Sequence, residues 1–237
     1  DIETAYAEYR FKDVYRSAYD FVNDLSAVYM DVAKDRLYSE APASTRRRAV
    51  QTVLINILEV LVRVLSPILS FTCEEVWAHY PSTVRDAENR EISVQLAGWP
   101  KAEDFTPALP AEDELSKILK DFGEVIAVRD VVTKALEDAR GEKVINKSQE
   151  AMVTVAAPQA LLDHLARYDA AVFEELFIVS SVAFVEGGEL AATVEPATGE
   201  KCPRCWNFRE LGGNANHPQV CKRCGDALDA IGFTEAE

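Results

Sequence analysis

Four cysteines near the end of the 237-residue chain are the residues best suited to carry chemistry. They form two C-x2-C pairs, Cys202/Cys205 and Cys221/Cys224, which are separated by fifteen residues. A C-x2-C turn brings two sulfurs to one point, and two such turns supply the tetrahedral thiolate set that Zn²⁺ prefers. We therefore predict a structural zinc site formed by these four cysteines.

Other chemistry for the same sulfurs remains open at this level. They could form two disulfides, a redox C-x-x-C motif or an iron–sulfur cluster, and His217, otherwise expected on a surface loop, could replace one thiolate. The tight cluster favours a metal in a reducing compartment over a secreted disulfide framework. Four thiolates leave no open coordination position, so the metal is not expected to be catalytic. The fifth cysteine, Cys73, is expected in an apolar core.

The charge around the cysteines differs from that of the rest of the chain. The whole chain has a net charge of −15, which excludes a uniformly basic protein that coats nucleic acid. Residues 201–225 hold five basic residues and one acidic residue, hence +4, which leaves −19 for the remainder. A positive tip on an acidic body predicts a local anion site, and RNA is the large anion that it suits.

The candidate RNA-binding residues combine cations with one aromatic ring. Trp206 offers a face on which an unpaired base can stack, and arginine pairs with phosphate or a guanine edge. Alternatively, Trp206 covers the metal site and the charges form a solvated rim. Three arginines also begin a helix, where cations oppose the helix dipole and so invite a phosphate contact; an exposed charged turn is the alternative. The full set is Arg204, Trp206, Arg209, Lys222, Arg223, Arg46 and Arg47.

The elements that must position these residues are mainly helical. Apolar side chains recur every three or four residues, which predicts helices over 11–37, 46–65, 71–79, 112–140 and 159–177. Segment 46–65 is apolar nearly all round, which predicts a place at the centre of a bundle. Strands are expected over 151–156, 178–185 and 190–194, with the last two as partners. Residues 81–111 are expected to be an irregular acidic connection with an extended piece at 92–96, and 231–237 a frayed end.

The fold class that follows is multidomain and mainly α. We expect a helical bundle with its acidic connection over 1–110, an α+β junction unit over 111–196, and a zinc module over 197–237. Charged and polar residues interrupt the longest apolar stretch, so no transmembrane segment is predicted. No signal peptide is recognised, and the chain does not begin with Met, so we interpret it as a piece of a longer polypeptide. We also expect a cytoplasmic location and a monomeric state.

Several stretches together resemble one family. Residues 24–38 (DLSAVYMDVAKDRLY) and 65–77 (LSPILSFTCEEVW) resemble the anticodon-binding bundle of class I aminoacyl-tRNA synthetases. Residues 119–140, 143–155 and 175–181 are similar to the junction that follows that bundle. Residues 201–206 and 217–224, with Cys-Trp and His-Pro-x-x-Cys, resemble the C-terminal zinc module of the bacterial-type isoleucyl enzymes.

The resemblance implies a non-catalytic fragment that recognises the anticodon stem-loop of an isoleucine tRNA. Its partners would be that tRNA and the missing N-terminal catalytic and editing domains, and its metal would be Zn²⁺. No P-loop, dinucleotide-binding or nucleophile-elbow motif occurs in the chain, in keeping with a fragment that has no catalytic residues. By resemblance, Arg204 and Trp206 would contact the anticodon loop. The alternatives are a zinc-stabilised protein-interaction module, from a valyl- or leucyl-type synthetase or an assembly protein, and a zinc enzyme.

Overall fold

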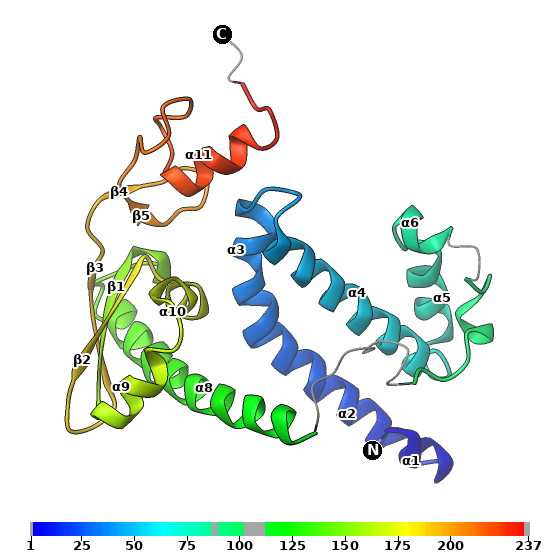
Figure 1. The fold of residues 1–237 in the computed structure, drawn as a ribbon. Helices are drawn as coiled ribbons and strands as arrows, with labels where there is room; N and C mark the ends of the chain where they lie inside the picture. Colours follow the sequence, from blue (N-terminus) through cyan, green and yellow to red (C-terminus); the bar gives the residue numbers. More distant parts are fainter. Residues whose placement is uncertain (1, 87–89, 102–111, 235–237) are drawn as a thin grey trace. The chain divides into compact units, whose positions relative to one another are not determined.

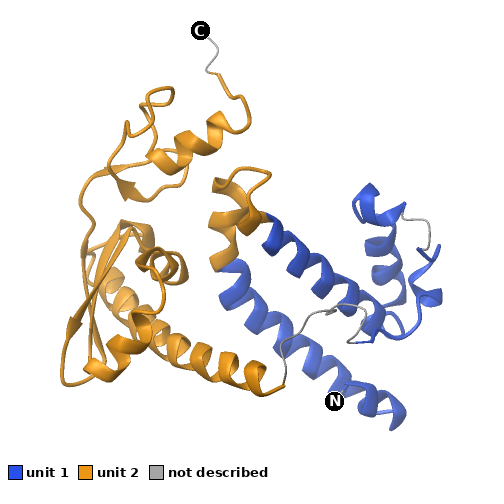
Figure 2. Cartoon of the chain, in the orientation of Figure 1, with its two compact units in different colours: residues 1–31, 48–109 blue, residues 32–47, 110–237 orange. Residues whose placement is uncertain are grey.

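The computed structural model describes residues 2–86, 90–101 and 112–234. The chain divides into two compact units (Figure 2). Unit 1 comprises Asp1–Asp31 and Arg48–Leu109, and unit 2 comprises Val32–Arg47 and Pro110–Glu237. The first part of unit 2, residues 32–47, is here named the corner segment. Among the described residues, no helix is both long and apolar enough to cross a membrane.

Unit 1 is helical. Its elements are α1 (Ile2–Ala7), α2 (Phe11–Asp24), the π-helix η1 (Leu25–Met30), most of α4 (Thr45–Leu65), α5 (Ser70–Ala78), α6 (Ser82–Arg85) and the 3₁₀-helix η2 (Val94–Leu96). The main core of the unit joins α4, α5 and η2 through Val62, Cys73, Trp77, Tyr80 and Val94. Cys73 is 4% exposed, which confirms its predicted core position.

Two expectations for unit 1 are wrong. Helix α4 buries only Val50, Val62 and Val64, and Val53 and Leu58 are exposed, because its described neighbours in the unit cover only part of its apolar circumference. The extended piece expected at 92–96 is instead the turn η2. The Ser93 hydroxyl accepts a hydrogen bond from the Gln95 backbone N–H at 3.1 Å, the cap that favours a helical turn over a strand.

Unit 2 combines the corner segment with a three-stranded sheet and the cysteines. Helix α3 (Asp31–Ser39) supplies the first half of the corner segment, and the long helix α8 (Glu112–Gly141) leads to η3 (Ser148–Glu150). Strand β1 (Ala151–Ala157) is followed by α9 (Gln159–Leu165), α10 (Ala170–Phe177), β2 (Ser181–Glu186) and β3 (Ala191–Pro196), as Figure 1 shows. The expected helix over 159–177 is therefore two helices, separated by residues 166–169.

The sheet order is β2-β1-β3, which corrects the expected pairing of the last two strands. Strand β1 runs parallel to β2, with Val153 opposite Val182, and antiparallel to β3, with Val153 opposite Val194. The α9–α10 crossover makes β2 a parallel neighbour of β1, and β3 occupies the other edge. The central strand β1 buries every second side chain in a core that it shares with α8 and α10. Val128 and Val132 of α8 and Phe173 of α10 are each at most 1% exposed in this core.

The clustered cysteines lie in a small part of unit 2, residues 200–229, which we name the zinc module after the predicted ion. It contains the short strands β4 (Glu200–Lys201) and β5 (Phe208–Arg209), a bridge between Leu211 and Cys221, and helix α11 (Lys222–Asp229). Its core is formed by Cys202, Val220, Cys221 and Cys224, with few apolar neighbours. Residues 231–234 follow α11, and 235–237 lie outside the described residues. A mainly helical chain with a small sheet and a terminal cysteine cluster confirms the predicted fold class.

Candidate metal centre and nucleic-acid interface

The four cysteines meet at one point. Their sulfur atoms all lie within 4.8 Å of one another, and the Sγ atoms of Cys205 and Cys221 are 3.8 Å apart. Four ligands placed tetrahedrally at a zinc–sulfur distance of ~2.3 Å would be about 3.8 Å from one another. All five cysteines of the chain are free thiols, which argues against the disulfide alternative.

Local hydrogen bonds fix the two cysteine turns. The Trp206 N–H donates to the Cys202 carbonyl at 2.8 Å and closes the first turn. Cys221 is the N-cap residue of α11 and has an extended backbone. Its carbonyl accepts a hydrogen bond from the Gly225 N–H at 3.0 Å. A side chain at Gly225 would meet Asn214 at 2.6 Å, so the glycine permits close packing of the loop on α11. The Cys221 N–H points at the Cys202 sulfur, 3.4 Å away, and links the two turns.

The clustered sulfurs shift the pKa values of their neighbours in opposite directions, and hydrogen bonds with Cys205 and Cys221 raise the pKa of Cys224 above its ordinary value. Hydrogen bonds from the thiols of Cys205 and Cys224 lower the pKa of Cys221 well below its ordinary value, in spite of burial. Cys202, Cys221 and Cys224 are each at most 2% exposed. Thiolate is the form that ligates metals, and a buried set of four with no further donor suits a closed structural ion.

His217 is not part of the cysteine cluster, and it is not on the surface. Its side chain is 3% exposed, which corrects the expected surface position. The His217 ring lies 6.1 Å from the Phe233 ring, and its Nε2 is 3.3 Å from the Asp229 carboxylate. The sequence signal was misleading because the apolar contact with Phe233 comes from sixteen residues further along the chain.

Trp206 projects from the first cysteine turn. Its side chain is 52% exposed, and its backbone φ of 67° lies in the left-handed region that side chains rarely adopt. An indole that covered the metal site would be buried, so the structure favours the alternative in which the ring faces outward. Such strained, outward residues occur at binding sites, where the surrounding structure holds them in place.

Arg204 and Arg223 both bind the corner segment. Arg204 donates to the backbone carbonyls of Tyr38, at 3.3 Å, and of Ser39. Arg223 forms a two-pronged ion pair with Asp35 of α3, one arm of which is 2.8 Å long. These two arginines therefore attach the zinc module to the last turns of α3.

The other predicted cations also have partners within unit 2. Arg209 donates to Glu174 of α10 at 2.8 Å, and Lys222 pairs with Asp226 on its own helix at 2.6 Å. Arg46 reaches the Glu175 carboxylate, whose side chain is 5% exposed, and also Glu40 at 3.2 Å. Arg47 donates to the Glu40 carbonyl at 3.1 Å. Their RNA contacts stay predictions, and an RNA phosphate would have to compete with these intramolecular partners.

Lys147 is a residue that the sequence did not single out for RNA. It lies just before η3, and its Nζ is 5.2 Å from the centre of the Trp206 ring. Only the fold brings the two together, because 58 residues separate them in the chain. Residues 143–148 gave no signal for RNA beyond their two lysines.

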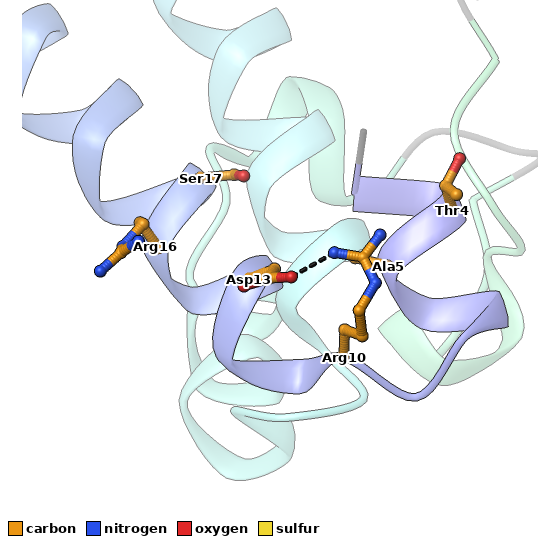
Figure 3. Close-up of a pocket in the computed structure, with 6 residues that line it drawn as sticks. All are labelled: Thr4, Ala5, Arg10, Asp13, Arg16 and Ser17. Carbon is orange, nitrogen blue, oxygen red and sulfur yellow. Dashed lines mark hydrogen bonds and ion pairs between the residues drawn. The ribbon is translucent and has the colours of Figure 1, made fainter.

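A separate hollow lies in unit 1 between α1 and α2 (Figure 3). It measures about 350 Å³ and is lined by Thr4, Ala5, Arg10, Asp13, Arg16 and Ser17. Arg10 pairs with Asp13 across it and with Glu8, so the carboxylates neutralise that guanidinium. Nothing in its lining suggests catalysis.

Comparison with known families supports the resemblance of both the helical region and the cysteine region. Residues 1–155 match the model of the anticodon-binding domain of tRNA ligase. Residues 199–226 match a zinc finger found in FPG and IleRS. The second match covers all four clustered cysteines and Trp206.

Similar curated proteins are isoleucine–tRNA ligases of bacteria. The chain is 42% identical to that of Carboxydothermus hydrogenoformans, over 96% of this chain and 24% of the relative. It is 39% identical to the ligase of Desulforudis audaxviator, over 96% and 25%, and 38% identical to that of Kosmotoga olearia, over 98% and 25%. The chain thus spans about a quarter of the length of these relatives.

Proposed function

Because this chain belongs to the family of anticodon-binding domains of tRNA ligases, we propose that it binds the anticodon stem-loop of a tRNA. The similar proteins are isoleucine–tRNA ligases, so the proposed tRNA is the isoleucine acceptor, and the proposed parent is such a ligase. Amino-acid activation would belong to other parts of that parent. The observation that carries the RNA proposal is the exposed, left-handed Trp206 next to a metal ligand.

We also propose that the four cysteines hold one Zn²⁺. The distances between their sulfurs and the match of residues 199–226 to a zinc finger support this assignment. The ion would fix the turn that presents Trp206, since the module has little apolar core of its own. An exposed indole at a fixed position offers a stacking face to an unpaired base, the usual way in which proteins read RNA loops.

Binding of RNA hairpins to the 237-residue chain tests the function. The isoleucine anticodon stem-loop is compared with the same hairpin carrying an exchanged anticodon, in a filter-binding titration at fixed salt. The proposal expects tighter binding of the isoleucine hairpin. Equal or absent binding of the two hairpins contradicts anticodon recognition and favours a protein-interaction module.

A further inference from the structure

The cation that contacts the exposed indole comes from outside the zinc module. Lys147 places its ammonium group 5.2 Å from the centre of the Trp206 ring, within the ~6 Å range of a cation–π contact. The ammonium therefore lies over one face of the ring. The lysine is exposed, and its loop is held by Asn146, which donates backbone and side-chain hydrogen bonds to Glu150 at 2.9 and 3.3 Å.

The charge of Lys147 is available for a ligand. In the part of the chain that the structure describes, Lys147 has no carboxylate within ion-pair distance. The candidate cations of the zinc module differ in this respect: Arg209, Lys222 and Arg223 pair with carboxylates, and Arg204 donates to two carbonyls. An RNA phosphate would have to compete with those partners, but not at Lys147.

We propose that Lys147 is a phosphate-binding residue of the Trp206 site, and that the ligand is a nucleotide of a single-stranded RNA loop. This inference rests on the proposed function. The base stacks on the face of the indole that Lys147 leaves open, and the ammonium contacts the phosphate beside it. The junction unit and the zinc module thereby form one site, in which the aromatic ring and the cation come from different parts of unit 2.

Two lysine variants of the 237-residue chain test the proposal. Lys147→Gln removes the charge over the indole. Lys143→Gln removes another exposed charge from the same loop, and among the described residues Lys143 has no contact to that ring. Affinity for the isoleucine anticodon stem-loop is measured between about 50 and 200 mM KCl, where counterion release dominates. We expect Lys147→Gln to raise Kd about three- to tenfold and to reduce the salt slope by about 0.7, the value for one phosphate on a single strand.

The control and a double variant decide between outcomes. Lys143→Gln should change the slope less than Lys147→Gln, and Lys147→Gln should have a smaller effect in a Trp206→Ala background, because residues of one site are not additive. Equal effects of the two lysine variants, additivity with Trp206→Ala, or a wild-type slope for Lys147→Gln would overturn the assignment, even if Trp206→Ala weakens binding. If the unchanged chain fails to bind the hairpin, the proposed function falls and this inference with it.

Discussion

Arg223, next to the cysteine ligand Cys224, is paired with Asp35, which precedes it by 188 residues in the chain. Burial alone would raise the pKa of the Asp35 carboxyl, but the hydrogen bonds and charge of Arg223 outweigh it and hold that pKa below its ordinary value. The same pair raises the pKa of Arg223. The pair therefore joins helix α3 to the zinc module as two ionised groups.

Removal of this pair should loosen the zinc module. A double-mutant cycle consists of Asp35→Asn, Arg223→Gln and the variant that carries both substitutions. We expect the two side chains to couple by about 1 kcal/mol in the free energy of unfolding, a value between those of exposed and buried ion pairs. Urea unfolding at neutral pH measures it. Because the folded pKa of Asp35 is depressed, its contribution is complete above about pH 4 and is lost as the pH falls through the lower folded value. Strictly additive single variants would contradict the coupling.

Metal content should depend on the clustered cysteines and not on Cys73. We expect about one zinc ion per chain, and its loss in Cys221→Ala, because three thiolates do not complete the closed set. Loss of the ion removes roughly 10–16 kcal/mol of binding free energy, so residues 200–229 should also lose amide protection. Cys73→Ala, in the core of unit 1, should keep the metal. Elemental analysis and hydrogen exchange measure the two effects; a metal-loaded Cys221→Ala protein would refute the site.

Trp206→Gly should separate binding from folding. Glycine adopts a φ of 67° without strain, so the variant relieves the backbone strain at this position. This gain offsets the loss of the cation–π contact with Lys147. Thermal unfolding should therefore change little, while affinity for the anticodon hairpin falls by about 1–3 kcal/mol, the usual loss of one stacked base. Trp206→Phe keeps an aromatic ring, so its affinity for the hairpin should lie between those of the unchanged chain and the glycine variant. Unchanged affinity of the glycine variant would remove Trp206 from the RNA contacts.

Phe173 should be critical to the sheet of unit 2. It is 1% exposed, and its ring lies 4.9 Å from Phe184 and 5.9 Å from Phe177. Phe173→Ala leaves a cavity and should destabilise the unit by about 3–5 kcal/mol. Denaturant unfolding followed by circular dichroism measures the loss. Phe71→Ala, at a residue that is 94% exposed, is the matched control and should cost little.

The helices and the cysteine cluster could be predicted from the sequence because their signals are local. Val125, Val128, Val132 and Leu136 recur at helical spacing and are all buried in α8. The spacing of the cysteines was enough to bring four sulfurs together. Local patterns did not predict the strand order, because contacts between distant segments determine it. Strands β2 and β3 follow one another in the chain and were expected to pair, but β1 lies between them.

The partners of the arginines could not be predicted for the same reason. A run such as Arg46-Arg47-Arg48 has the same appearance whether its charges face solvent or a buried carboxylate such as Glu175. Likewise, nothing near Lys147 in the sequence indicates an indole 59 positions later. The net charge of +4 over residues 201–225 was real, but much of it is used within the fold.

The attachment of the zinc module through Asp35 has a thermodynamic consequence. If ordering of the module depends both on its ion and on its grip on α3, each must strengthen the other by the same factor, since linkage is reciprocal. A substitution of Asp35, which is not itself a metal ligand, would then weaken retention of the metal against a chelator. Depletion of the metal would in turn leave the Asp35 carboxylate without its counter-charge.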